Sequence, residues 1–295
     1  MSLNKSDGKS GMNAARENKI QVVFVKWGTK YGPSTVRRHL RAIRKHATCD
    51  VRIVIVSDRK EPDYGPDVTV KPFPQFAAPT EHLKAGCRLK LAVFSKEILE
   101  PGIPALFLDL DTLVRGDVAR VADYIRCKGQ ISLLQGHYLQ WWPIQKYVRP
   151  FIGEKYYFGN SSAIGFWPEE YYWIFDEFNR VVDESYRGEQ LPKKYMSDER
   201  FISYVARDNT RVFPTTLIVK FAEEYLTPWP PLESVRGRLP WVRKRRDRLL
   251  GVTFVSHVLK PEQLVQLKNG DLIRYKRMRG YWNYPEYKQY WSEPV

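Results

Sequence analysis

The sequence predicts one α/β domain, and three features near its start carry that prediction. Residues 19–28 form a short apolar run that closes at a glycine, as a buried strand does. Residues 32–47 follow with Val36, Leu40 and Ile43 at helical spacing. Residues 51–58 are a second apolar run. A strand, a helix and a strand in this order indicate a right-handed parallel crossover, and such sheets bind ligands at the carboxyl ends of their strands.

Helices and strands continue to alternate along the chain, which favours a single domain. Residues 81–100 predict a helix that stops at a Pro-Gly pair. Its expected buried face is Cys87, Leu91, Phe94 and Ile98. The next strand begins at Ala105. The other expected elements are helices at 117–125, 168–185 and 197–206, and strands at 131–136 and near 210–214, 216–221 and 251–257.

Composition narrows the class of protein. The chain has 295 residues, 43% of them hydrophobic, which suits a domain with a substantial core. No apolar run approaches the roughly 18 residues of a membrane-spanning helix. Residues 1–18 are polar, lack the apolar middle of a signal peptide and predict a disordered lead-in. The three cysteines have no metal-ligand spacing, which indicates free thiols in a reducing compartment. We therefore expect a cytoplasmic protein.

The net charge of +15 predicts an anionic partner. Basic residues gather in 236–250 and 274–291, where tryptophan and tyrosine accompany them. Amphipathic rings among basic side chains suit the headgroups of an anionic membrane, here the inner membrane face. A solvated charged face is the alternative. We expect no nucleic acid, because no recognised binding motif accompanies the charge.

Asp109 and Asp111 stand at the end of the apolar run that begins at Ala105. Residues two apart on a strand share a face, where two carboxylates repel unless a cation lies between them. Capping of the next turn is one interpretation. A haloacid-dehalogenase phosphatase is another, although Leu113 stands at the fifth position of that motif. A divalent metal explains the pair better, because hard oxygen ligands suit Mg²⁺ or Mn²⁺.

Five segments in order resemble glycosyltransferase family 8, the glycogenin-like and bacterial lipopolysaccharide sugar transferases. They are "RLKLAVF", "LFLDLDTLVRGDV", "YFGNSSAIGFWP", "MSDERFISYV" and "FVSHVLKP". The resemblance implies a GT-A domain, a Rossmann-like mixed sheet flanked by helices, over residues 19–261. Residues 262–295 would then be a basic, aromatic C-terminal extension. In "NSSA" the family's glycine is replaced, and the segment from His257 to Lys260 is shortened.

The resemblance also implies roles for particular residues. Asp109, Asp111 and His257 would hold Mn²⁺ or Mg²⁺. Lys90 and Lys260 would lie near the phosphates. Side chains that would orient the donor sugar or act in catalysis are Asn160, Ser161 and Asp198.

The strand ends suggest further nucleotide contacts. Lys26, Trp27 and Gly28 close the first strand, where a nucleotide would lie in such a sheet. Asp58 closes the second strand, where it would either cap the following loop or, as the resemblance to GT-A enzymes implies, accept a hydrogen bond from the base.

Together these observations predict a metal-dependent transfer of a sugar from a nucleotide diphosphate, with UDP as the expected nucleotide, to a saccharide or lipid-linked acceptor. The resemblance implies retention of anomeric configuration and a place in cell-surface polysaccharide or lipopolysaccharide synthesis. The alternative is a nucleic-acid- or membrane-binding protein with a degenerate GT-A fold.

Overall fold

The computed structural model describes residues 18–135, 159–186, 197–254 and 259–293. Its central feature is a seven-stranded mixed sheet in the order β3-β2-β1-β4-β7-β6-β8. Strands β3, β2, β1 and β4 run parallel, β7 runs antiparallel to both of its neighbours, and β6 pairs with β8 in parallel. The strands are β1 (Lys19–Lys26), β2 (Asp50–Ser57), β3 (Val68–Lys71), β4 (Ala105–Leu108), β6 (Ile131–Leu134), β7 (Asn160–Phe166) and β8 (Thr210–Val212).

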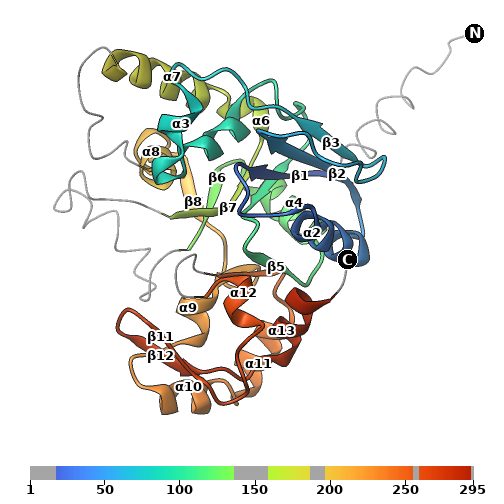
Figure 1. The fold of residues 1–295 in the computed structure, drawn as a ribbon, viewed down its shortest axis with the longest axis vertical. Coiled ribbons are helices and arrows are strands. Elements are labelled where there is room, and N and C mark those ends of the chain that lie inside the picture. The colour runs from blue at the N-terminus through green and yellow to red at the C-terminus, as the bar shows by residue number, and fades with distance from the viewer. Residues whose placement is uncertain (1–17, 136–158, 187–196, 255–258, 294–295) are drawn as a thin grey trace, which may run out of the picture.

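Both faces of this sheet are covered by helices (Figure 1). On one face, Val22 and Phe24 of β1 pack in a cluster with α2 (Pro33–His46) and α4 (Ala119–Lys128). The alternate residues Val23 and Val25 join the cluster on the opposite face. The elements there are α3 (Thr80–Leu83), the 3₁₀ segment η1 (Ala85–Phe94), α6 (Pro168–Tyr171), α7 (Trp173–Tyr186) and α8 (Asp198–Val205). The expected crossover through α2 is confirmed, because β1 and β2 pair in parallel.

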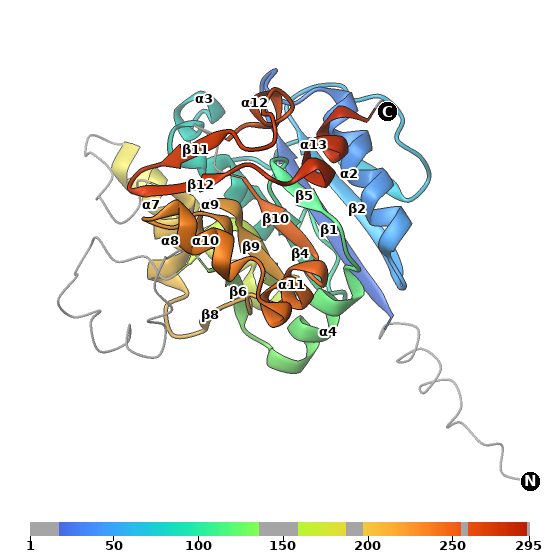
Figure 2. The same cartoon turned by 90° about the horizontal axis from the view of Figure 1, so that it is seen from below.

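A second layer lies below the central sheet in Figure 1 and in front of it in Figure 2. It holds a three-stranded sheet in the order β5-β10-β9 and the hairpin β11-β12. Its elements are β5 (Thr112–Val114), β9 (Ile218–Lys220), α9 (Phe221–Tyr225), α10 (Pro230–Arg236), α11 (Pro240–Asp247), β10 (Gly251–Thr253), α12 (Pro261–Leu264), β11 (Leu272–Tyr275), β12 (Met278–Tyr281) and α13 (Pro285–Ser292).

The C-terminal residues belong to the core of this second layer. Trp282, Tyr287 and Trp291 are buried in one cluster with Phe221 and Phe254. The expectation that the aromatic residues of 274–291 face a membrane is therefore wrong for these three. Their rings instead cover apolar surface contributed by the strands and helices before them.

The expected helix over residues 81–100 is also wrong in part. α3 ends at Leu83, and the chain then kinks at Gly86 and Cys87, whose φ angles are 66° and 58°. Cys87 is exposed rather than part of a buried stripe. The 3₁₀ segment continues after this kink, and Lys90 is buried within it.

Two features of the surface bear on membrane contact. In the ranges that the structure describes, no helix combines the length and apolar character needed to cross a bilayer. Basic residues of 236–250 divide into two groups: Arg236, Arg245 and Arg246 pair with Glu224 or Glu233, whereas Arg238, Arg243, Lys244 and Arg248 are exposed.

Candidate active site

The candidate site lies at the carboxyl ends of the central parallel strands. β1 and β4 run in parallel, so the residues after both strands lie at one edge of the sheet. β7 runs against β4, with Leu108 opposite Ala163, and therefore begins at that same edge. The backbone N–H of Asp109 donates to the carbonyl of Ser162 at 2.9 Å. Strand pairing alone thus brings the start of "NSSAIGF" beside the carboxylate pair.

The sequence suggested that Asp109 and Asp111 share one strand, but in the structure they do not. Asp109 follows β4 of the central sheet, and Asp111 precedes β5 of the second sheet. A turn joins them, in which the N–H of Thr112 donates to the carbonyl of Asp109 at 3.0 Å. Both aspartates nevertheless line one cavity of about 390 Å³. The pair therefore marks the point where the chain passes from one sheet to the other.

Lys90 provides the positive charge of this cavity. Its ammonium lies 2.7 Å from Oδ1 of Asp109 and 3.8 Å from Oδ2 of Asp198. Burial lowers the pKa of Lys90, but the two carboxylates outweigh burial and raise it above its usual value. The lysine is therefore a permanent cation between two acidic side chains that come from different elements.

Asp198 is held at the start of α8. Ser197 caps this helix by accepting a hydrogen bond from the N–H of Arg200, which confirms the expected cap. Asp198 is buried, and its Oδ2 accepts a 2.6 Å hydrogen bond from the hydroxyl of Ser161. Burial raises the pKa of Asp198 to about 6, although Lys90 and the Ser161 hydroxyl both favour the charged form. The carboxylate is thus fixed in place and directed at the cavity that it lines.

Asn160 is fixed by two contacts. Its amide nitrogen donates to Oε2 of Glu199 at 2.5 Å, and its side-chain oxygen accepts from the N–H of Ser162 at 3.1 Å. Asn160, Ser162 and Glu199 all line the cavity. Two polar pairs, Asn160 with Glu199 and Ser161 with Asp198, therefore join β7 to α8 side by side.

The two aspartates fit a hard divalent cation. Oδ1 of Asp111 is buried, and among the described residues it has no hydrogen-bond partner. Burial, followed by repulsion from Asp109, raises the pKa of Asp111 to about 7. A bound cation would remove both penalties. His257, expected as the third ligand, lies outside the described residues, and within them no third histidine, cysteine or acidic side chain completes a metal cluster.

Of the residues expected at the nucleotide, the structure brings Trp27 to the cavity. Lys26 instead forms a buried ion pair with Glu61 at 2.5 Å. The two oxygens of Asp58 accept from the N–H of Gly28 at 3.2 and 3.0 Å, which ties the ends of β1 and β2 together. These three residues are not among those that line the cavity.

Lys260 is also outside this lining, because it precedes α12 in the second layer. The residues that line the cavity without an expected role include Lys30, Tyr31, Lys220 and Phe254. The first two lie in the loop after β1, so the rule that ligands bind at strand ends would have included them. Lys220 and Phe254 reach the cavity through the second sheet, which the sequence did not predict.

No protein-family model and no curated protein matches the chain. Solved structures do match it. The galactosyltransferase LgtC, in complex with donor and acceptor sugar analogues, is 13% identical with a TM-score of 0.53, over 82% of this chain and 88% of LgtC. The glycosyltransferase GlyE of Streptococcus pneumoniae TIGR4 is 11% identical with a TM-score of 0.55, over 92% of this chain and 61% of GlyE. The bifunctional glycosyltransferase WbbM is 11% identical with a TM-score of 0.59, over 99% of this chain and 51% of WbbM.

The chain has a GT-A glycosyltransferase fold. The fold expected from the family 8 resemblance is thereby confirmed, while the chain spans only about half of WbbM and three-fifths of GlyE. In this GT-A fold the haloacid-dehalogenase alternative has no support. Asp109 follows β4, which has one parallel and one antiparallel neighbour in the mixed sheet.

Proposed function

We propose that the protein is a glycosyltransferase that moves a sugar from a nucleotide diphosphate, with UDP as the expected nucleotide, to a saccharide acceptor. One observation carries this proposal. Asp109, Asp111, Lys90, Asn160 and Asp198 come from four separate segments and line one cavity in a chain with a glycosyltransferase fold. A fold alone hosts many functions, so the proposal depends on this convergence of charged and amide groups.

The reaction breaks the bond between the anomeric carbon and a diphosphate oxygen, whose electron pair leaves with the diphosphate. An acceptor hydroxyl forms the new bond to that carbon and loses its proton to water. Negative charge grows on the departing diphosphate, and the ammonium of Lys90 is a fixed cation near that charge. Because Lys90 is already buried and paired, it does not need to reorganise during the reaction.

Asp198 and Asn160 position the sugar in this proposal. The carboxylate of Asp198 accepts hydrogen bonds from sugar hydroxyls. Its hydrogen bond from Ser161 holds this carboxylate in a fixed orientation. Asn160 is clamped by Glu199 and by the backbone of Ser162. Fixed partners of this kind hold a substrate in its reactive orientation. Retention of anomeric configuration is expected from the family 8 resemblance, and the anomer of the product identifies it by proton NMR.

Mn²⁺ or Mg²⁺ would be held by Asp109 and Asp111, with His257 as the expected third ligand. When bound, such an ion supplies Lewis-acid stabilisation of the diphosphate. The orphan Oδ1 of Asp111 is the observation that favours it.

The direct test is slow hydrolysis of the donor. The purified protein is incubated with Mn²⁺ and a panel of UDP-, GDP- and dTDP-sugars, and release of nucleoside diphosphate is measured. We expect one UDP-sugar to be hydrolysed, and Asp198→Asn to slow this reaction. If no nucleotide sugar binds or is hydrolysed, while the protein retains a cooperative thermal transition, the proposal fails.

A second proposal concerns attachment to an anionic membrane surface. Four exposed apolar side chains lie on or beside α10 and α11, at the lower end of the molecule in Figure 1. They are Trp229, Leu232, Val235 and Trp241. The exposed basic residues of the same two helices accompany them, a combination that suits lipid headgroups. Binding through this surface would bring the protein to a lipid-linked acceptor at the inner membrane face.

A further inference from the structure

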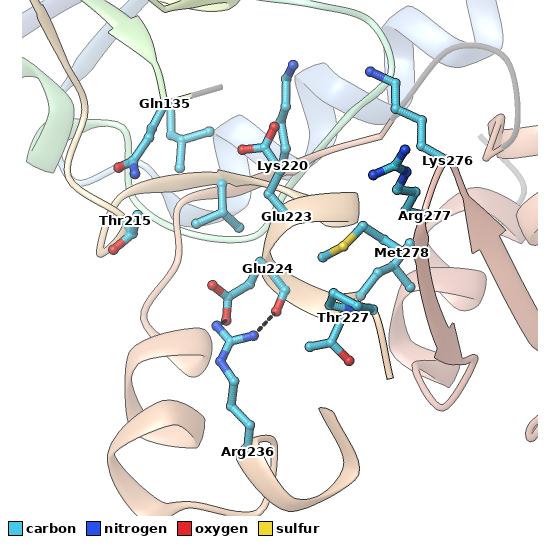
Figure 3. A pocket seen from close by; sticks show the side chains of 14 residues that line it. Gln135, Thr215, Lys220, Glu223, Glu224, Thr227, Arg236, Lys276, Arg277 and Met278 are labelled. Atoms are coloured by element: carbon cyan, nitrogen blue, oxygen red, sulfur yellow. Dashed lines mark hydrogen bonds and ion pairs between the residues drawn. The ribbon is translucent and has the colours of Figure 1, made fainter. Parts of the chain in front are cut away.

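A second cavity of about 790 Å³ lies between the three-stranded sheet and the hairpin β11-β12 (Figure 3). Ile218, Val219, Leu226 and Met278 give it apolar walls. Charged groups come from two directions: Lys220 and Glu223 from β9 and α9, and Lys276 and Arg277 from the hairpin turn.

The two cavities adjoin. Lys220 lines both of them, as the last residue of β9. β9 pairs with β10, with Lys220 opposite Thr253, and the next residue, Phe254, lines the first cavity. Lys220 is therefore a wall residue of both the second cavity and the candidate donor site. In a transfer reaction, such a neighbouring space is where an acceptor belongs, because its hydroxyl must reach the donor sugar.

The second cavity carries unneutralised positive charge. Lys220, Lys276 and Arg277 form no ion pair in the described ranges. The carboxylate of Glu224 is already paired with three arginines, including Arg236, as the dashed lines of Figure 3 show in part. Glu223 interacts with Lys220 and Lys276, which favour its charged form, but burial outweighs them and raises its pKa to about 7. One carboxylate thus faces three cations, and this excess of positive charge favours an anionic ligand.

Lys276 is also held in a strained conformation. Its φ is 54°, and it occupies the two-residue turn between Tyr275 and Met278. Glycine or asparagine is preferred at such a position, because the Cβ of other residues is crowded there. Only Cys87 shares a positive φ among the non-glycine residues that the structure describes, and Cys87 lines the donor cavity. Residues with a strained backbone thus occur at both cavities, and such residues cluster at binding sites.

We propose that the second cavity binds the acceptor, and that the acceptor is a saccharide carrying an anionic group, a phosphate or a carboxylate, held by Lys220, Lys276 and Arg277. This inference rests on the proposed transferase activity and adds the acceptor's chemical class to it. The anion does not react. It anchors the acceptor so that a hydroxyl elsewhere on the saccharide faces the donor cavity across Lys220.

The test is calorimetric titration of three probes into the protein saturated with UDP and Mn²⁺. The probes are glucose 6-phosphate, glucuronate and glucose, and the bound UDP prevents the phosphate from occupying the donor site. We expect at least one charged probe to bind about tenfold more tightly than glucose, since charged hydrogen bonds contribute about 1.5 kcal/mol or more. The two charged probes distinguish phosphate from carboxylate recognition.

Two variants locate the binding. Lys276→Gly removes a charge and relieves the positive φ, so we expect weaker binding of the charged probe together with unchanged or higher thermal stability. Lys220→Met keeps a long, unbranched side chain and removes the ammonium group. Arg274→Gln is the matched control, because Arg274 is exposed on β11 and outside the lining of the cavity.

The outcomes separate the two proposals. Failure of UDP to bind would overturn the proposed function and this inference with it. Binding of UDP, with glucose as good a ligand as the charged probes, would overturn the inference alone. The same conclusion follows if Lys220→Met and Lys276→Gly bind the charged probe as tightly as Arg274→Gln does.

Discussion

The ammonium of Lys90 lies 2.7 and 2.8 Å from the two carboxylate oxygens of Asp109 and 3.8 Å from Asp198. It thereby connects the turn after β4, which carries the candidate metal ligands, to the start of α8, which carries the candidate sugar-binding acid. The kink at Gly86 and Cys87 precedes the 3₁₀ segment that places Lys90 there. One buried cation thus links the two halves of the candidate donor site.

The rate of donor hydrolysis should decrease as the pH falls through about 6. Burial raises the pKa of Asp198 to that value, and its charged form is a stronger hydrogen-bond acceptor for sugar hydroxyls than the protonated acid. Ser161→Ala removes a hydrogen bond that stabilises the charged form. We expect the acidic limb of the rate profile to move upward by about half to one pH unit. Ser162→Ala is the control, and equal acidic limbs in both variants would refute the role of Ser161.

Alkylation should report occupancy of the donor cavity. Cys87 and Cys127 are both exposed. Cys87 lines the cavity, whereas Cys127 lies on α4 and does not line it. Burial of the Cys87 sulfur raises its pKa, so labelling with N-ethylmaleimide is best followed near pH 8.5 by mass spectrometry. UDP with Mn²⁺ should slow labelling of Cys87 and leave Cys127 unaffected. Equal protection of both cysteines, or of neither, would count against a nucleotide in this cavity.

His39 should make stability fall at acidic pH. Its two ring nitrogens lie 2.8 Å from the carbonyls of Thr35 and Thr112, which joins α2 to β5. Burial lowers the pKa of His39 to about 4, from about 6.5 in the unfolded chain. Between these values the unfolded state binds more protons, so stability decreases as the pH falls.

At pH 5 the loss relative to pH 7.5 should be about 2 kcal/mol. Urea unfolding of wild type and His39→Gln measures it, because contributions from Asp111 and Asp198 are common to both proteins and cancel in the difference. The same pH dependence in both would show that the imidazole does not titrate as described.

Membrane binding should depend on the exposed tryptophans beside α10 and α11. Trp229 and Trp241 are 65% and 67% exposed. Replacing both with serine should weaken sedimentation with phosphatidylglycerol vesicles by about tenfold or more, because each indole buries apolar area in the interface. Trp173→Ser removes an exposed tryptophan from α7 as a control. Vesicle binding that is the same in the double variant and the control would remove the membrane proposal.

Sequence periodicity predicted the longer strands and helices of the central sheet layer. The apolar runs of β1 and β2, the helical spacing of α2 and the cap at Ser197 each depend on neighbours in the chain, and the structure confirms them. The resemblance to family 8 predicted four further site residues, and in the structure all four line one cavity with Asp109. They are Lys90, Asn160, Ser161 and Asp198.

What the sequence did not predict depends on contacts between distant segments. β5 has three residues, too few to show a period, so Asp109 and Asp111 were assigned to one strand instead of two sheets. The rings of Trp282 and Trp291 are buried only because the second layer folds over them. Lys220 reaches two cavities through pairing of β9 with β10, a parallel pair with no local sequence signal.

Titration of UDP with and without Mn²⁺, into wild type and Asp111→Asn, tests the central claim most directly. Removing a buried carboxyl that Asp109 repels should leave the melting temperature unchanged or higher. UDP should bind wild type only with Mn²⁺, and Asp111→Asn should lose about tenfold or more of that affinity. Asp123→Asn, an exposed acid on α4, serves as control. Equal binding with and without metal, or by Asp111→Asn and wild type, would contradict a metal and nucleotide site at these aspartates.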